Sequence, residues 1–206
     1  RPHDGALLAL VSSPGFNPQN PEPALRDDIN KPAFNRATQG RYAPGSVLKI
    51  LVAAAALEKG LSPVYHCPAQ GYIAGSGTPP IRDSEYYASA RQGRTWQGWG
   101  QLDMKAAMRH SSNVYFAQLG VACGVEDFKA MMERAGINAS LTYLKNAHGE
   151  LQGARGNMPD IRKAPELAQL AIGQGAMLVT PLHVACFTAA VAAEGRMMRP
   201  RLLYDA

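Results

Sequence analysis

Apolar runs alternate along the chain with segments rich in glycine, proline and asparagine. Residues 6–12 are a short apolar run after Gly5, a pattern typical of a turn that leads into a buried strand. The prolines and asparagines of residues 14–32 predict a surface loop. Residues 46–57, rich in alanine and leucine and followed by Gly60, predict a buried helix.

Three shorter segments in the middle of the chain have helical patterning, at residues 102–109, 113–123 and 125–134. Ser112 is a capping type of residue before the second segment, and Gly124 follows that segment. Residues 61–100 are rich in glycine, proline and tyrosine, which favours loops and short strands. Residues 145–166 are predicted to be a polar, irregular connection.

The last part of the chain contains one clear helix signal. Thr180 before Pro181 predicts a capped helix that runs to about Glu194. Residues 172–175, Ile-Gly-Gln-Gly, are expected to be a tight element, and residues 199–203 are a candidate strand start.

The composition is that of an ordinary globular protein and does not by itself indicate a function. The 206 residues suffice for one substantial domain, and 46% hydrophobic with 18% charged residues is usual for a packed core. The net charge of +5 is thinly spread, without long basic runs or interleaved basic and aromatic residues. A basic surface is therefore favoured over nucleic-acid recognition.

The three cysteines do not form a recognisable metal or disulfide pattern. Cys123 and Cys186 lie in apolar helical stretches, where free cysteine acts as a small hydrophobe. Cys67 follows His66, but no second ligand pair with zinc spacing follows. We therefore predict no metal site and no cofactor.

The sequence contains no signal peptide, transmembrane run or lipidation motif. It begins at Arg1 without a methionine, so we expect it to be a fragment of a longer protein whose targeting segments lie elsewhere.

The pair Ser46 and Lys49 is the strongest candidate for chemistry. A serine hydroxyl needs a nearby base, and residues three apart on a helix share a face. Burial lowers the pKa of a lysine, and the neighbours of Lys49 are apolar. The tetrad alone also fits a helix start with an exposed lysine. Pro44-Gly45 directly before the serine, and the apolar helix around the lysine, favour the catalytic interpretation.

A second candidate element, Ser111-Ser-Asn113, lies between two predicted helices. The Ser111 hydroxyl could relay a proton, and the Asn113 amide could donate to and accept from a substrate peptide group. A plain helix cap is the alternative for this element alone. Ser-x-x-Lys together with a Ser-x-Asn-like triad is much more specific than either part.

The segment Arg41-Tyr-Ala-Pro-Gly-Ser-Val-Leu-Lys49 resembles the active-site segment of penicillin-binding proteins. Further blocks resemble the same family in order along nearly the whole chain: residues 4–18, Phe34-Asn-Arg-Ala37, His110-Ser-Ser-Asn-Val-Tyr-Phe116, residues 172–182, and Gly195 with Arg199-Pro200. The Tyr-x-Pro-Gly-Ser form looks more like the monofunctional class B proteins than the bifunctional ones.

The resemblance implies acyl transfer on D-alanyl-D-alanine stem peptides, with cross-linking of peptidoglycan and acylation by β-lactams. By match to the family motifs, Ser46 is the nucleophile, Lys49 the base, Ser111 the proton relay and Asn113 the substrate-positioning residue. No cofactor is implied.

The sequence departs from the family in its third motif. None of its lysines begins a Lys-Thr-Gly or Lys-Ser-Gly triad. The segment Gly75-Ser-Gly-Thr78 has similar residue types, but it precedes the Ser111-Ser-Asn113 element and so lies in the wrong order along the chain. The family motif follows the Gly-Gln-Gly block at some distance, so we expect a truncated chain rather than a natural pseudoenzyme, with no activity in this fragment.

The resemblance also implies an α/β (α+β) fold, with a helical subdomain packed on a mainly antiparallel sheet that is incomplete here. We expect one transpeptidase domain over residues 1–206, truncated at both ends, with the helical subdomain at roughly 61–170. Implied partners are stem peptides, β-lactams and proteins of a cell-wall synthesis complex, but no nucleic acid. The implied location is the extracytoplasmic face of the bacterial inner membrane, with an anchor outside this sequence.

Two other functions stay open. A serine β-lactamase or β-lactam sensor shares the Ser-x-x-Lys logic, and a β-lactamase needs a residue that activates water. Glu150 and Glu166 are weak candidates for that residue and better explained as surface glutamates. A non-catalytic scaffold of the same fold is the second alternative.

Overall fold

The computed structural model describes residues 1–202, which fall into two compact units. The first unit contains residues 1–42 and 135–157 and the chain from residue 178 onward. The second contains residues 43–134 and 158–177. All four candidate site residues belong to the second unit.

The helices of the described chain are α1 (Glu22–Arg26), the 3-10 helix η1 (Gly45–Leu48), α2 (Lys49–Glu58), α3 (Ser84–Arg91), α4 (Met104–His110), α5 (Asn113–Cys123), α6 (Val125–Arg134), α7 (Ala164–Ala171) and α8 (Pro181–Ala192). Its strands are β1 (Tyr65–Pro68), β2 (Gly98–Leu102), β3 (Thr142–Asn146) and β4 (Gly149–Gln152). They form two separate antiparallel pairs, β1 with β2 and β3 with β4. Within residues 1–202, no helix is both long enough and apolar enough to cross a membrane.

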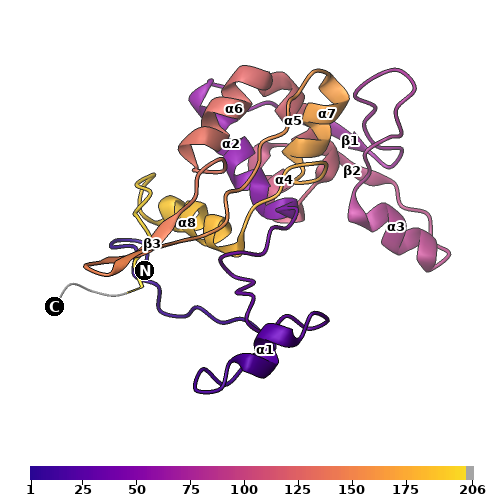
Figure 1. The fold of residues 1–206 in the computed structure, drawn as a ribbon. Coiled ribbons are helices and arrows are strands. Elements are labelled where there is room, and N and C mark those ends of the chain that lie inside the picture. The colour runs from indigo at the N-terminus through magenta and orange to yellow at the C-terminus, as the bar shows by residue number, and fades with distance from the viewer. Residues whose placement is uncertain (203–206) are drawn as a thin grey trace. The chain divides into compact units, whose positions relative to one another are not determined.

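The second unit is a group of helices around α5 (Figure 1). Most of α5 is buried, including Tyr115 and Phe116, because its sequence is apolar on nearly every face. At Gly120, a side-chain Cβ would lie 2.3 Å from the Cβ of Ala171 in α7. A glycine therefore allows α5 and α7 to approach closely.

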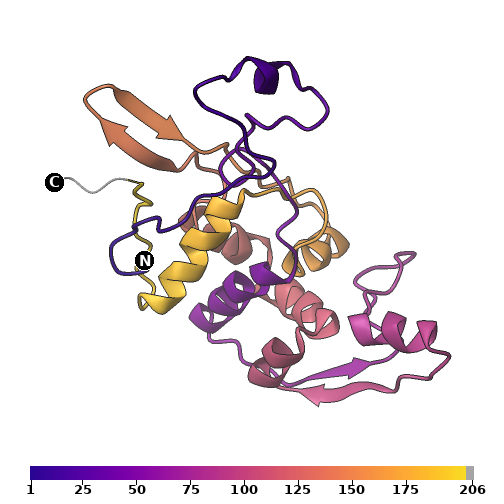
Figure 2. The same cartoon turned by 90° about the horizontal axis from the view of Figure 1, so that it is seen from below.

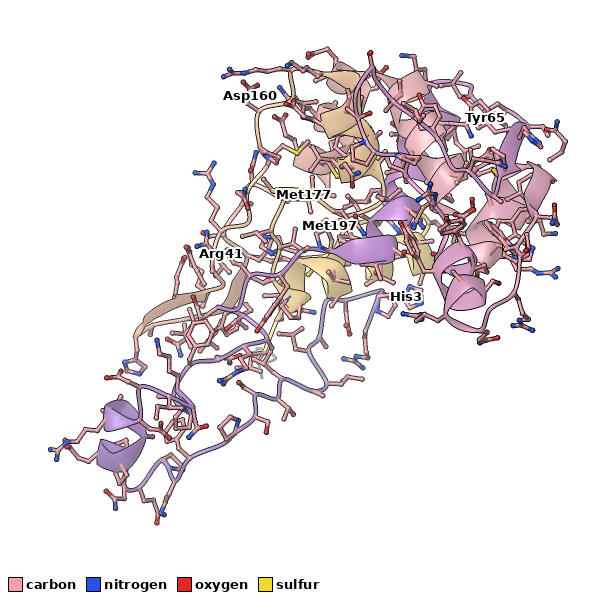
Figure 3. The ribbon with its side chains drawn as sticks, turned by 90° about the vertical axis from the view of Figure 1, so that its right-hand side faces the viewer. His3, Arg41, Tyr65, Asp160, Met177 and Met197 are labelled. Atoms are coloured by element: carbon pink, nitrogen blue, oxygen red, sulfur yellow. The ribbon has the colours of Figure 1, made fainter. Side chains whose placement is uncertain are left out.

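The β1–β2 pair packs against α5 through aromatic rings. The rings of Tyr65 and Tyr115 meet edge to face, with centroids 5.3 Å apart, and Figure 3 labels Tyr65 on this strand. The Tyr115 hydroxyl donates a hydrogen bond of 2.8 Å to the carbonyl oxygen of Pro63. The pair is thereby fixed to the central helix of its unit.

The first unit has its own core beneath α8 and the β3–β4 hairpin. Buried Tyr143, Leu182 and Cys186 form this core, with Leu7 and Leu10 packed against it. The hairpin appears as a separate two-stranded ribbon in Figure 2. Directly before α8, the Thr180 hydroxyl accepts a hydrogen bond from the backbone N–H of His183, as its capping role predicts.

The fold class agrees with the sequence expectation of helices combined with a small, mainly antiparallel and incomplete sheet. The helix predicted at residues 46–57 is found as η1 followed by α2, and those predicted at 113–123 and 125–134 match α5 and α6. The helix predicted at 102–109 begins two residues later, as α4.

The strand predicted at residues 6–12 is not formed. Ala6 makes a single bridge to Arg201, while Leu8 and Val11 are 77% and 79% exposed. A strand needs a neighbour that takes up its backbone hydrogen bonds, and beyond this bridge no strand of the described residues runs beside it. The strand start predicted at 199–203 is reduced to the same bridge, and residue 203 lies outside the described residues.

The prediction that residues 145–166 are irregular was wrong in part. The β3–β4 hairpin turns at residues 147–148, and α7 begins at Ala164. Glu166 explains the start of α7, because its carboxylate accepts hydrogen bonds from the backbone of Arg162 and Lys163. Helix α3, between β1 and β2, was likewise missed.

Candidate active site

Ser46 lies in the 3-10 turn η1, directly before α2. The residue before it, Gly45, has a φ of 61° and donates a backbone hydrogen bond of 2.9 Å to Gly173. A Cβ on Gly173 would lie 1.8 Å from the carbonyl oxygen of Gly45. The Ile-Gly-Gln-Gly segment therefore needs glycine at residue 173 to contact the backbone beside the serine.

Lys49, the first residue of α2, is fully buried. Its amine donates hydrogen bonds to the carbonyl oxygen of Ser111 at 2.5 Å, to the Ser111 hydroxyl at 3.1 Å and to the Asn113 side-chain oxygen at 2.8 Å. The ring of Phe116 lies under the amine, with its centroid 5.7 Å away. The structure thus brings together three of the four residues that the sequence proposed as a site.

The amine of Lys49 is shifted toward its neutral form. Burial lowers the pKa of Lys49 from 10.5 to about 8, and the negative charges of Asp83 and Glu85 act in the opposite direction. A substantial fraction of the amine is therefore neutral slightly above neutral pH. A buried lysine in this state can accept a proton, whereas an ordinary surface lysine cannot.

Ser111 and Asn113 are placed by the junction of α4 and α5. Ser111 ends α4 in the left-handed conformation, with a φ of 52°. This conformation is uncommon for a residue other than glycine, and here it accompanies a serine whose carbonyl and hydroxyl both contact Lys49. Asn113 then begins α5, one residue after the Ser112 cap.

The side chain of Ser46 is exposed and forms no hydrogen bond to Lys49 among the contacts of residues 1–202. The two residues are joined through the backbone, because the Lys49 N–H donates to the carbonyl oxygen of Ser46. They therefore occupy one helical turn as the spacing predicts, with the serine hydroxyl open to solvent. Catalytic hydrogen bonds are often absent from a free enzyme and form when the substrate binds.

Asp83 is a member of this site that sequence reasoning missed. Its carboxylate is buried and accepts hydrogen bonds from the backbone of Asn113 and Val114 and from the Ser112 hydroxyl. Its position before α3 gives it the sequence signature of an ordinary helix cap, so nothing in the pattern pointed to a contact 30 residues further along the chain.

The remaining sequence candidates have structural roles. The Glu150 carboxylate pairs with Lys145, which lowers its pKa, and the Glu166 carboxylate caps α7. In the Gly75-Ser-Gly-Thr78 segment, the Thr78 hydroxyl closes a local turn by donating to the Gly75 carbonyl at 2.7 Å. Among residues 1–202, no cluster of three or more His, Cys, Asp or Glu side chains could hold a metal ion.

A cavity of about 650 Å³ opens in the same unit. Its walls include Ile81, two residues before Asp83, and Gly175, two residues after Gly173. Asp160, labelled in Figure 3, and Glu166 supply the carboxylates of its lining, which is otherwise largely apolar. Two segments that contact the site therefore continue into the walls of this cavity.

The model of the penicillin binding protein transpeptidase domain family matches residues 1–205. The chain belongs to this family. It is 30% identical to the peptidoglycan D,D-transpeptidase PbpA of Mycolicibacterium smegmatis, over 98% of this chain and 41% of that protein. It is also 30% identical to the peptidoglycan D,D-transpeptidase MrdA of Acinetobacter baumannii, over 98% of this chain and 31% of that protein.

Solved structures of the family have the same fold. Pseudomonas aeruginosa PBP2 in complex with WCK 5153 is 29% identical, with a TM-score of 0.79 over 98% of this chain and 47% of that one. PBPA from Mycobacterium tuberculosis is 28% identical, with a TM-score of 0.80 and the same coverage of both chains. The chain thus spans less than half the length of the relatives that it matches.

Proposed function

We propose that this chain contributes the acyl-transfer residues of a D-alanyl-D-alanine transpeptidase that cross-links peptidoglycan. In this proposal Ser46 is the nucleophile, Lys49 the general base, Ser111 the proton relay and Asn113 a substrate-binding residue. The observation that carries it is the buried Lys49 amine, which contacts both Ser111 and Asn113 one helical turn from Ser46. That arrangement supplies a base with a lowered pKa one helical turn from an accessible hydroxyl.

The first half of the reaction forms an ester. The Ser46 oxygen attacks the carbonyl carbon of the penultimate D-alanine while the neutral Lys49 amine takes the hydroxyl proton. The bond from that carbon to the terminal D-alanine nitrogen then breaks, and the proton passes through the Ser111 hydroxyl to the departing amine. The backbone N–H groups at the start of η1 are candidate donors to the oxyanion.

In the second half, the amine of a neighbouring stem peptide attacks the ester. A new peptide bond forms as the ester bond to the Ser46 oxygen breaks, and the proton that the attacking amine loses passes through the Lys49 amine to that oxygen. A β-lactam enters the first half in the same way, because the serine opens its four-membered amide ring. Its leaving nitrogen remains attached to the acyl group, so the serine ester persists.

The relatives support this assignment. The PbpA and MrdA proteins are named peptidoglycan D,D-transpeptidases. Penicillin-binding protein A from M. tuberculosis, 29% identical to this chain, forms acyl-enzyme complexes with imipenem and penicillin G. The partners proposed for the present chain are accordingly stem peptides and β-lactams.

The proposal extends to the setting of the enzyme. Peptidoglycan lies outside the bacterial inner membrane, so the domain is proposed to act on the extracytoplasmic face. Proteins of a cell-wall synthesis complex are proposed as further partners. The helical subdomain of the transpeptidase domain is proposed at roughly residues 61–170, most of which belong to the second unit, residues 43–134 with 158–177.

The test is mass spectrometry of the full-length protein after treatment with penicillin G. We expect one added acyl group, mapped to Ser46 and abolished by Ser46→Ala. The matched control is Ser76→Ala, in the glycine-rich segment whose residue types are similar to those of the third family motif. We expect this variant to keep full labelling. Labelling that survives Ser46→Ala would refute the nucleophile.

The same experiment separates the alternatives. A β-lactamase would release the acyl group with fast turnover, whereas a transpeptidase holds it. A protein that never labels in its full length would be a scaffold of this fold. No contact favours the β-lactamase alternative, because the carboxylates of its two candidate water-activating residues, Glu150 and Glu166, are both engaged in structural bonds.

A further inference from the structure

We infer that Asp83 is a positioning residue of the proposed acyl-transfer site: its carboxylate holds the start of α5 and so keeps Ser111 and Asn113 on the Lys49 amine. This inference rests on the proposed function for its effect on acylation. The contacts that carry it belong to the chain whatever reaction the site performs.

The carboxylate completes the hydrogen bonding of the α5 N-terminus. Asp83 is 1% exposed and accepts from the backbone N–H groups of Asn113 and Val114, the latter at 3.1 Å. The Tyr115 N–H donates to the Ser112 hydroxyl at 3.1 Å, and the N–H of Ser112 itself donates to the carbonyl oxygen of Ala107 at 2.9 Å. All four N–H groups that a helix start leaves open therefore have acceptors.

The Ser112 hydroxyl joins the two parts of this network. It donates to the second oxygen of Asp83 at 3.1 Å and accepts from Tyr115. The hydroxyl proton is thereby committed to the carboxylate and one lone pair of the oxygen to the helix backbone, in the direction that a negative, acceptor-only carboxylate requires. A neutral amide at residue 83 would present a donor there and would compete with this arrangement.

Asp83 does not cap the helix that it precedes. It occupies the N-cap position of α3 and is of a preferred capping type, yet its side chain accepts no hydrogen bond from α3. Burying a carboxylate costs free energy unless the charge is well bonded, and the positive end of a helix is a favourable place for it. An aspartate at an N-cap position normally accepts hydrogen bonds from its own helix, whereas Asp83 accepts them from the start of α5 at the candidate site.

The same segment orients the Asn113 amide. Its nitrogen donates to the carbonyl oxygen of Arg82 at 3.0 Å, so its oxygen is left to accept from Lys49 at 2.8 Å. Residues 82 and 83 therefore fix both the backbone and the side chain of Asn113. Ser111 adjoins this anchored start and presents its carbonyl and hydroxyl to the same amine.

The charged and titratable groups around the carboxylate can be assigned from each element. Lys49 comes from α2, Glu85 from α3 and Cys67 from β1. Burial raises the pKa of the Cys67 thiol to about 11, so the thiol is neutral in the range where Lys49 titrates. Glu85 also raises the pKa of Lys49, but its carboxylate bonds only the Ser84 hydroxyl among the contacts of the described chain. Glu85→Gln is therefore a matched control that removes a charge without touching α5.

The experiment measures the rate of acylation by penicillin G against pH in the full-length protein, for the wild type, Asp83→Asn and Glu85→Gln. For Asp83→Asn we expect a rate lower by about 10- to 100-fold, the cost of losing a charge-assisted hydrogen bond at an oriented group. We also expect the midpoint of the pH profile to move to lower pH, because one of the charges that raises the pKa of Lys49 is gone. Glu85→Gln keeps the rate and shows at most a smaller displacement of the midpoint.

Each outcome decides the inference. A normal rate in Asp83→Asn, or a lower rate with an unchanged midpoint, overturns it, since the second result means packing alone. If Asp83→Asn does not fold, Ser112→Ala replaces it, and an unchanged acylation rate in that variant overturns the inference. If the wild type is not acylated, the proposed function fails, and the inference about Asp83 is tested separately. In that case the Lys49 amine is titrated by NMR in the wild type and in Asp83→Asn, and an unchanged titration midpoint of the amine would overturn the inference.

Discussion

At the scale of single residues, the site depends on an amine that is removed from water and still fully bonded. Lys49 gives its hydrogen bonds to Ser111 and Asn113, which compensate for its burial without adding a negative charge in direct contact. Burial therefore dominates, and the pKa falls to about 8. A carboxylate in place of Asn113 would be expected to hold the amine protonated.

Replacing Lys49 by arginine tests this point. The guanidinium keeps the positive charge and its hydrogen bonding, but it does not lose a proton in the accessible pH range. We expect the acylation rate to fall by about 100-fold or more, the usual contribution of a general base. Wild-type acylation should rise with pH through about 8 as the amine becomes neutral, and this rise should be absent in Lys49→Arg.

Stopped-flow or quenched acylation with a fluorescent penicillin between pH 6 and 9.5 provides the measurement. Lys59→Arg is the matched control, because Lys59 starts no motif and pairs with Asp127 on the surface of the same unit. A wild-type profile that is flat across this range, or an arginine variant of normal rate, would remove Lys49 from the role of base.

The sequence indicated which residues meet at the candidate site better than it indicated the residue that supports them. Ser46, Lys49, Ser111 and Asn113 are distinguished by residue type and spacing, and three of them do meet. Asp83 could not be found in this way, since its partners lie 29 to 31 residues away and only the folded chain brings them together. Sequence patterns over a few residues indicate contacts between residues that are close along the chain, and the contacts of Asp83 are not of that kind.

At the scale of secondary-structure elements, helices were more predictable than strands. Helices α5 and α6 carry their own stop signals in glycine and their own apolar patterning, so their bounds follow from the sequence. The run at residues 6–12 has the composition of a strand but pairs only at Ala6. A strand depends on its neighbour, and that neighbour is not encoded in the run itself.

Gly120 offers a test of the close packing of α5 and α7. An added Cβ would meet the Ala171 Cβ at 2.3 Å, well inside contact distance. We expect Gly120→Ala to lower the free energy of unfolding by about 1–3 kcal/mol through overpacking, even though alanine is the better helix former. Urea unfolding followed by circular dichroism measures the change.

A second substitution turns this into a double-mutant cycle. Ala171→Gly removes the atom that the new methyl group would meet, so the pair of changes should be less destabilising than the sum of the two. Strict additivity would show that α5 and α7 do not approach as closely as described.

At the scale of the whole molecule, the buried titratable groups make the free energy of unfolding vary with pH in the alkaline range. In the unfolded chain Lys49 keeps its proton up to its ordinary pKa of 10.5, while in the folded chain it loses the proton near 8. Between these values the unfolded state binds more protons, so this residue makes the folded state more stable as pH rises. Cys67, Cys186 and Tyr115 act in the opposite direction, because folding raises their pKa values to about 11, 11 and 12.

The opposing groups are separated by comparing the wild type with Lys49→Met, which retains the buried length of the side chain without the amine. Both proteins contain the same cysteines and Tyr115, so the difference in their free energies of unfolding isolates Lys49. We expect this difference to change in favour of the wild type as pH rises from 8 to 10, with a slope of at most about 1.4 kcal/mol per pH unit. Chemical denaturation at fixed pH values measures it. A difference that stays constant over this range would mean that the Lys49 amine titrates at its ordinary pKa in the folded chain, and both its burial and its fitness as a base would then be contradicted.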